Sequence, residues 1–296
     1  MLGLNKEQTI DALSQAWVDG QSLRTYRHAP NAGPRKSWAA GDATSRALQL
    51  VLLTQKGQIG YPSVLTAPTW GFYDVQFKGE QFSLPREFSS YVMENVLFKI
   101  SFPAEFHAQT SVEAAVILHE EIKDRIDEIE TVEITTHESA IRIISKEGAL
   151  NNPADRDHCI QYMTAIGLLK GDLVAEDYED DVASDSRIDE LRKKMVIKED
   201  ERYTKEYLEE DKRSIANAIV IHFKDGSSTE KVEVEYPIGH RRRREQGIPL
   251  LIEKFKANLS TQFSENRTKE ILSMCEDQST LENSSVIDFM NLMIAE

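Results

Sequence analysis

The stretch AIVIHFKDGSSTEKVEVEY, residues 218–236, predicts a β-hairpin. Its first arm is mostly apolar, and Asp225-Gly226 supplies the backbone conformation that a tight turn needs. In the second arm, Val232, Val234 and Tyr236 alternate with charged neighbours, the pattern of a strand with one buried face and one wet face. The sequence therefore predicts an antiparallel sheet in the middle of the chain.

Helical patterns lie on both sides of this hairpin. Residues 131–135 alternate as a strand, and helices are expected at 5–20, 41–56, 137–145, 154–169, 248–259 and 267–274. Asn5 and Gln8 have the spacing of a capping box, and Gly171 follows the helix at 154–169 as a stop signal. The order of helical, mixed and again helical segments predicts a multidomain α and α+β fold.

The predicted domains are a partial all-helical domain and an α+β lid. The two ends of the chain, 1–93 and 246–296, are expected to form the helical domain, and 94–245 the lid. Within the lid, residues 172–212 hold 16 acidic and 8 basic side chains. Because the two signs are interleaved, we expect an exposed helical elaboration there and no functional site.

The charge balance excludes one class of partner. The 296 residues include 35 Lys and Arg against 50 Asp and Glu, a net charge of −15, whereas nucleic-acid binding needs a basic surface. Arg241–Arg244 are the exception, and their run indicates a solvated or salt-bridged turn or a subunit contact. No apolar run reaches the length of a membrane span, and the first residues lack a secretory signal. We expect a cytoplasmic protein with no nucleic-acid or membrane partner.

Two cysteines, Cys159 and Cys275, limit the metal and redox chemistry. They cannot form a disulfide scaffold, and one chain with two thiols cannot hold an iron–sulfur cluster on three or four thiolates. The sequence also lacks a phosphate-binding loop, a dinucleotide fingerprint and a zinc-protease motif. We therefore expect no cofactor and no metal site.

Cations and polar groups stand out in segments that are otherwise suited to burial. They occur in Arg35–Asp42, just before a predicted helix, in Phe98–His107, among four large apolar side chains, and in Asp155–Tyr162. These segments carry a resemblance to the dehydratase branch of the MmgE/PrpD family. The similar stretches are Tyr26–Asn31, Arg35–Ala43, Trp70–Asp74, Tyr91–His107, Asn151–Tyr162, Tyr236–His240 and Gly247–Leu250.

The resemblance implies a hydro-lyase that removes water from 2-methylcitrate to give 2-methylaconitate in propionate breakdown, without an iron–sulfur cluster. It implies a homodimer, in the cytoplasm or in the mitochondrial matrix of a eukaryote. Family members are longer, so the chain is expected to be a fragment that lacks the N-terminal helical half, which supplies an Asp and a His to the site. A tricarboxylate substrate agrees with cations gathered in one cleft of an acidic protein.

By resemblance, Lys36 and Lys99 bind carboxylates and stabilise charge, and Tyr162 donates a proton or orients the substrate. From its own surroundings, His107 is a candidate acid or base, and Arg35, Arg156 and His158 are weaker candidates for binding the substrate. Each residue has a structural alternative: a solvated lysine, a hydrogen-bonded core histidine, or a packed tyrosine.

Two other functions stay open at this stage. A relative of the family that decarboxylates or isomerises another polycarboxylate shares the lysine positions. The other alternative is an inert truncated chain that needs another chain to fold.

Overall fold

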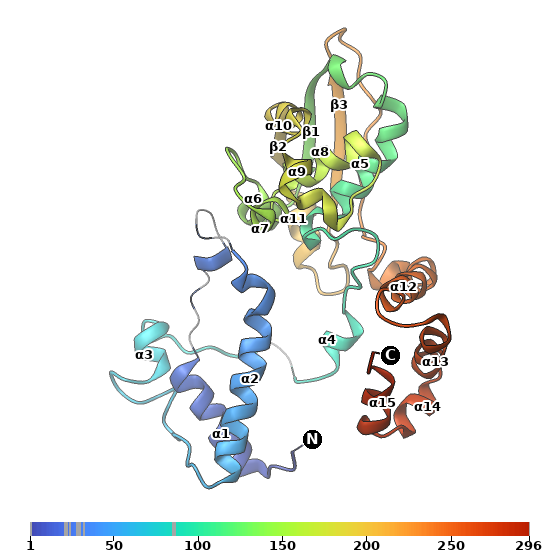
Figure 1. Ribbon diagram of the computed structural model, residues 1–296. Helices are drawn as coiled ribbons and strands as arrows, with labels where there is room; N and C mark the ends of the chain where they lie inside the picture. Colours follow the sequence, from blue (N-terminus) through green and yellow to red (C-terminus); the bar gives the residue numbers. More distant parts are fainter. Residues whose placement is uncertain are drawn as a thin grey trace. The chain divides into compact units, whose positions relative to one another are not determined.

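The computed structural model describes residues 2–20, 23, 25–27, 31, 33–84 and 87–295. The chain divides into two compact units, residues 1–89 and residues 90–296. The multidomain α and α+β fold predicted from the sequence is confirmed, with a helical first unit and a sheet in the second (Figure 1). Among the helices of the described residues, none combines the length and the apolar character that a membrane crossing requires. The assignment of residues 246–296 to a helical domain with residues 1–93 stays a prediction.

The first unit is built on α1 (Lys6–Asp19) and α2 (Arg35–Gln55), joined by η1 (Thr25–Arg27) and followed by α3 (Phe72–Gln76). The predicted capping box is present, because Asn5 and Gln8 exchange side-chain and backbone hydrogen bonds. Helix α2 begins at Arg35 rather than at Gly41, since Pro34 fixes the backbone at its N-cap position. The family-like stretch Tyr26–Asn31 lies partly outside the described residues.

The second unit contains a 4-stranded sheet in the order β2-β1-β3-β4. Its strands are β1 (Ile129–Thr136), β2 (Met195–Glu199), β3 (Asn217–Phe223) and β4 (Val232–Val234). The predicted hairpin is confirmed, with β3 and β4 antiparallel and Gly226 at a φ of 83° in the turn. Strand β1 pairs antiparallel with β3 and parallel with β2.

The acidic segment, residues 172–212, is more than an exposed elaboration, and this expectation is wrong. The segment supplies β2, an edge strand of the sheet, and buries Leu173, Ile188 and Tyr203 in the interior. Most of its charged side chains are exposed or half-buried, but Asp177 and Glu206 are buried with the apolar anchors. The segment is therefore integrated into the fold of the second unit.

The centre of the second unit is the contact between α5 (Gln109–Ile122) and α8 (Ile160–Lys170), which lie against the sheet (Figure 1). Every residue of α8 from Ile160 to Leu168 is buried, as expected of a helix that is apolar all round. The predicted helix at 154–169 is broken into α7 (Pro153–Arg156) and α8, and Gly171 ends α8 in a left-handed conformation.

Helices α5 and α8 run parallel, because their contacts follow the same order along both. Ser111 Oγ lies 2.8 Å from Thr164 Oγ1, Ala115 faces Gly167, and His119 Nδ1 lies 2.8 Å from the carbonyl oxygen of Leu168. Both N-terminal ends therefore lie at the same edge of the helix pair.

Further elements complete the second unit. They are α4 (Tyr91–Glu94), η2 (Phe106–Ala108), η3 (Ile126–Glu128), α6 (Glu138–Ile144), η4 (Ala175–Tyr178), α9 (Asp180–Ala183), α10 (Ser186–Lys193), α11 (Glu201–Leu208), η5 (Arg241–Arg243), α12 (Arg244–Leu259), α13 (Glu265–Glu276), α14 (Gln278–Asn283) and α15 (Val286–Leu292). The helices predicted at 137–145, 248–259 and 267–274 correspond to α6, α12 and α13. The arginine run forms a bonded turn: Arg243 pairs with Glu113 at 2.9 Å, and Arg242 donates to the carbonyl oxygen of Asp211.

The close approach of α5 and α8 leads to a test on Gly167. A Cβ atom at Gly167 would lie 2.9 Å from Cβ of Ala115, so Gly167→Ala should lower the free energy of unfolding by about 1–3 kcal/mol through overpacking. The matched control is Gly41→Ala in α2, where the new methyl group meets open space. This change should raise the free energy of unfolding by about 0.5–1 kcal/mol, because alanine favours the helix more than glycine does. Urea unfolding followed by circular dichroism measures both. A stabilising effect at Gly167 would contradict the described contact.

Candidate active site

The N-terminal edge of the α5–α8 pair carries a cluster of polar side chains. His107 lies in η2, directly before α5, and His158 lies just before α8. His158 is buried, and its Nδ1 is 2.8 Å from Asp157 Oδ1. Helix N-termini present unpaired N–H groups and partial positive charge, so this edge is suited to anionic groups.

His107 is held between a carboxylate and a phenol. Its Nδ1 lies 2.8 Å from both carboxylate oxygens of Glu105, and its Nε2 lies 3.2 Å from the hydroxyl of Tyr207 in α11. Burial of Glu105 acts to raise its pKa, but the hydrogen bonds and charge of His107, with a smaller contribution from His158, hold that pKa below its usual value. Glu105 is thus ionised, and both nitrogens of His107 are oriented.

A second histidine lies beside this arrangement. His137, the N-cap residue of α6, is fully buried, and its ring stacks on Tyr207 at 4.5 Å between centroids and 14° between planes. Its ring centroid lies 5.1 Å from that of His107. Neither ring nitrogen of His137 has a hydrogen-bond partner among the described residues. Burial, together with the charge of His107, lowers the pKa of His137 to about 4, so its ring is uncharged at neutral pH.

Lys99 extends the cluster towards solvent. Its side chain is exposed, and its Nζ lies 5.3 Å from the centre of the Phe106 ring, next in sequence to His107. A cation over an aromatic face is attracted electrostatically, and this restrains a flexible side chain. Lys99, His107 and His158 are therefore three predicted site residues that the structure gathers in one region.

Arg156 and Tyr162 are bound to the acidic segment. The Arg156 guanidinium donates to the carbonyl oxygen of Tyr178 at 2.6 Å and pairs with Asp180 at 2.7 Å. The Tyr162 hydroxyl donates to the carbonyl oxygen of Asp177 at 2.6 Å, and burial is the main cause that raises its pKa to about 12. Both side chains line a small cavity of about 160 Å³ at this junction.

The remaining predicted residues, Arg35 and Lys36, lie in the first unit at the start of α2. The Arg35 guanidinium pairs with Asp42 at 2.9 Å and lies 4.2 Å from the Trp38 ring centre. The first turn of α2 contains no acidic residue, and the N-terminal end of a helix attracts negative charge, so this helix start is suited to an anionic group.

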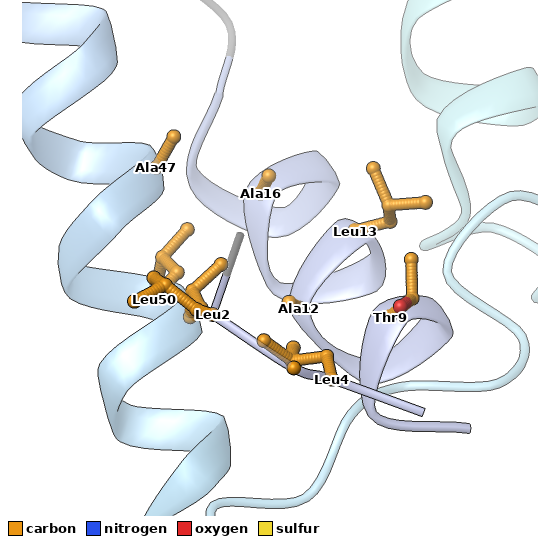
Figure 2. A pocket seen from close by; sticks show the side chains of 10 residues that line it. Leu2, Leu4, Thr9, Ala12, Leu13, Ala16, Ala47 and Leu50 are labelled. Carbon is orange, nitrogen blue, oxygen red and sulfur yellow. The ribbon is translucent and has the colours of Figure 1, made fainter. Parts of the chain in front are cut away.

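Two larger cavities are lined by other residues. Figure 2 shows a cavity of about 410 Å³ between α1 and α2, with Leu2, Leu4, Leu13 and Leu50 among its lining side chains. Among the described residues, no charged side chain lines this cavity, which makes it unsuited to a tricarboxylate.

A second cavity, of about 830 Å³, lies between α6, α10 and β2 and is lined by Lys146, Arg192 and Lys193, among other residues. Two of these cations are already paired, Lys146 with Asp155 and Arg192 with Asp189.

Metal-binding geometry is not found in the described part of the chain: no group of three or more His, Cys, Asp or Glu side chains there could hold a metal ion. Cys159 is buried and Cys275 is half-buried, and both are free thiols. Burial raises the pKa of the Cys159 thiol, which makes this thiol a poor nucleophile.

Sequence reasoning missed Glu105, His137 and Tyr207. Glu105 carried a local signal, since a carboxylate two residues before a histidine can reach its ring. His137 and Tyr207 carried none, because Tyr207 lies 100 positions from His107 and joins it only through the tertiary fold.

Comparisons with known proteins all point to one protein family. Residues 1–85 match the MmgE/PrpD N-terminal domain, and residues 102–278 match the MmgE/PrpD C-terminal domain. The expectation that the N-terminal half has no counterpart in the chain is therefore wrong.

The chain is 60% identical over 297 residues to the 2-methylcitrate dehydratase of Escherichia coli K12, covering 99% of the chain and 62% of that protein. It is 58% identical to the mitochondrial 2-methylcitrate dehydratase of Yarrowia lipolytica, covering 99% of the chain and 57% of that protein. It is also 44% identical to the 2-methylcitrate dehydratase-like protein oryR of Aspergillus oryzae, covering 100% of the chain and 60% of that protein.

The chain spans about 62% of the length of the Escherichia coli relative, while nearly all of the chain is matched. The expectation that the chain is a fragment stays a prediction.

The buried, uncharged His137 generates a test of pH dependence. Its pKa is about 4 in the folded protein and about 6.5 in the unfolded chain. Between pH 6.5 and pH 4, His137 therefore binds a proton in the unfolded chain but not in the folded protein. Stability should therefore decline between pH 6.5 and pH 4, with a contribution of up to about 3 kcal/mol from His137.

Urea unfolding at several pH values should show a smaller decline for His137→Phe than for the wild type. His222→Phe, at an exposed position of β3, is the control and should follow the wild type. An equal loss of stability in His137→Phe and in the wild type would contradict the lowered pKa of His137. Burial also lowers the pKa of His240 to about 4, so His240 leaves a residual loss of stability at low pH in both proteins.

Proposed function

Because the chain belongs to the MmgE/PrpD family, we propose that it acts as a hydro-lyase that dehydrates 2-methylcitrate to 2-methylaconitate. The observation that supports 2-methylcitrate as the substrate is the 60% identity, over 99% of the chain, to a 2-methylcitrate dehydratase. The geometry contributes the acid–base group, since His107 is oriented by Glu105 and Tyr207 at the edge where two helices begin. The whole activity is a proposal because the chain spans 62% of that relative.

The reaction needs a base, an acid and cations. A base removes the proton on the carbon next to a carboxylate, the electrons of that C–H bond form the C=C bond, and the hydroxyl leaves as water after an acid protonates it. Negative charge builds on the neighbouring carboxylate as the proton departs, so fixed positive charge around it lowers the barrier.

His107 is the proposed acid or base of the second unit. Glu105 holds one nitrogen of its imidazole, so that the other is defined for proton transfer. The half-buried position reduces competition from bulk water while leaving the ring reachable.

Lys36 and Lys99 are proposed to bind the substrate carboxylates, supported by Arg35, Arg156 and His158. Lys99 supports this role through its exposed ammonium beside Phe106, and Lys36 through its place at the positive end of α2. Arg156 has its charge satisfied by Asp180 in the described arrangement, so its contribution needs that pair to open.

Tyr162 is proposed to orient the substrate or donate a proton, as the family resemblance implies. Its hydroxyl is bound to the carbonyl oxygen of Asp177, so either role requires this bond to be exchanged for one to the substrate. A phenol with a pKa of about 12 keeps its proton at neutral pH and is suited to donation rather than abstraction.

Two related proposals concern assembly and place. A homodimer is expected from the family resemblance, and the mass of the protein in solution checks it. The bacterial and mitochondrial relatives support a location in the bacterial cytoplasm or, in a eukaryote, the mitochondrial matrix.

The second candidate function is decarboxylation or isomerisation of another polycarboxylate, because cations and an oriented histidine suit any carbanion formed beside a carboxylate. An inert truncated chain is not favoured, since the match to the relatives runs through 99% of the residues.

A direct assay discriminates these functions. With 2-methylcitrate, the ultraviolet absorbance of a carboxylate conjugated to a C=C bond should rise, and a chelator should leave the rate unchanged. Citrate and cis-aconitate are the comparison substrates, and carbon dioxide release from cis-aconitate would favour the decarboxylase. Loss of activity on chelation with recovery on adding iron would refute the cofactor-free reaction.

The role of the lysines is tested separately. Lys36→Ala and Lys99→Ala should each lower kcat/KM by roughly 10²–10³, the effect of removing one charge-stabilising group. Lys269→Ala is the control, because this exposed lysine pairs with Glu265 on α13, away from the proposed site residues in sequence, and its loss should leave kcat/KM unchanged. Unchanged turnover in both lysine variants would exclude the cationic binding of carboxylates assigned to them.

A further inference from the structure

We propose that Tyr207 is a positioning residue of the candidate active site, holding Nε2 of His107 through its hydroxyl and so defining the atom at which this histidine exchanges protons. The inference rests on the proposed function only for the part that His107 plays in the reaction. It assigns a role to the acidic segment, residues 172–212, which the sequence and the proposed function left without one.

The hydrogen bonds around His107 determine where its proton lies. Glu105 is an ionised carboxylate and can only accept, so Nδ1, at 2.8 Å from both oxygens, must carry hydrogen. In the neutral imidazole, Nε2 then has a lone pair and accepts a hydrogen bond from the Tyr207 hydroxyl at 3.2 Å. Burial and the nearby charge of Glu105 raise the pKa of Tyr207, so the phenol stays protonated and can donate.

A phenolic hydroxyl also fits the protonated state of His107. When Nε2 takes up a proton, it becomes a donor, and the Tyr207 hydroxyl can rotate and accept through its oxygen. Because Nε2 has one lone pair, it takes up a proton only when the Tyr207 hydroxyl has turned its hydrogen away, and the hydroxyl oxygen then accepts from the new N–H. Tyr207 is thus the partner of Nε2 before and after the transfer. Phenylalanine cannot do this in either state.

The position of Tyr207 is fixed by stacking. The fully buried ring of His137 lies parallel to it at 4.5 Å, and the helix α11 that carries Tyr207 begins at an N-cap, Asp200, whose backbone N–H donates to the carbonyl oxygen of Thr136. Since neither nitrogen of His137 has a partner among the described residues, His137 acts through its ring face. Being uncharged, it places no second positive charge 5.1 Å from His107.

The charged groups that face the pair come from several elements. Glu105 precedes η2 and contacts His107 directly, and His158, before α8, acts on Glu105. Arg142 of α6 and Arg213, after α11, act on Tyr207. None of these four is altered by replacing Tyr207 with phenylalanine, so the variant isolates the hydroxyl.

The variant Tyr207→Phe tests the proposal, with Tyr203→Phe as its matched control. Tyr203 lies one turn earlier on α11, and its ring packs against Arg202. Removing the hydroxyl takes the partner of Nε2 away in both protonation states, so kcat should fall roughly tenfold with KM little changed. Tyr203→Phe should keep the wild-type kcat and KM. An unchanged kcat in Tyr207→Phe would overturn the proposal.

A spectroscopic measurement keeps the test independent of activity. In protein labelled with ¹⁵N at histidine, the neutral His107 ring should give a protonated Nδ1 and an unprotonated, hydrogen-bonded Nε2. The Nε2 resonance should move towards the value of a free lone pair in Tyr207→Phe and stay in place in Tyr203→Phe.

A protonated Nε2 in the neutral wild-type ring, or an Nε2 resonance that Tyr207→Phe leaves unmoved, would refute the inference. The expected resonances in a protein that does not dehydrate 2-methylcitrate would refute the proposed function alone.

Discussion

The parallel contact between α5 and α8 is the constraint on which the second unit depends. It requires Gly167, because a side chain there would meet Ala115, and it buries α8 on all sides. Since the helices are parallel, the segments that precede them, with His107 and His158, are brought to one edge. The hydrophobic effect that drives this burial thus also concentrates two helix N-termini and two imidazoles in the same place.

The acidic segment, residues 172–212, is the second contribution to that edge. Its apolar side chains anchor it to the core and its strand β2 extends the sheet, so its charges are carried on a rigid support. Helix α11 follows β2 directly and carries Tyr207 to His107. At its other end, the segment receives the polar atoms of Arg156 and Tyr162. These contacts join the segment to η2, α7 and α8.

Local patterns predicted local structure well. The capping box at Asn5, the hairpin around Gly226 and the left-handed Gly171 each depend on a few adjacent residues, so the sequence was sufficient. The sequence did not predict the parallel pairing of β1 with β2. The helices from α6 to α10 separate the two strands along the chain, and β2 lies in a highly charged segment. The interleaved charges hid the alternation of Met195 and Ile197, which face inward.

The site residues, too, could be predicted where the signal was local and could not be predicted where it came from the tertiary fold. Residue types indicated Lys99, His107 and His158, and the structure brings them into one region, while Arg35 and Lys36 lie in the other unit. The partners that orient His107 could not be predicted, since Tyr207 and His137 reach it only after the sheet and α11 have formed. Chemical reactivity here is a property of tertiary neighbours rather than of a motif.

The overall charge of −15 is compatible with a tricarboxylate because charge acts locally. At physiological salt, interactions between exposed charges are largely screened beyond about 8 Å, so the acidic surface of residues 172–212 adds little repulsion at a distance. The start of α2 carries Arg35 and Lys36, and Lys99 lies against the Phe106 ring close to the start of α5. Asp42 pairs with Arg35 at the start of α2. Because the N-terminal end of a helix favours negative charge, the helix dipole and the nearby cations act in the same direction on a carboxylate, whatever the net charge of the protein.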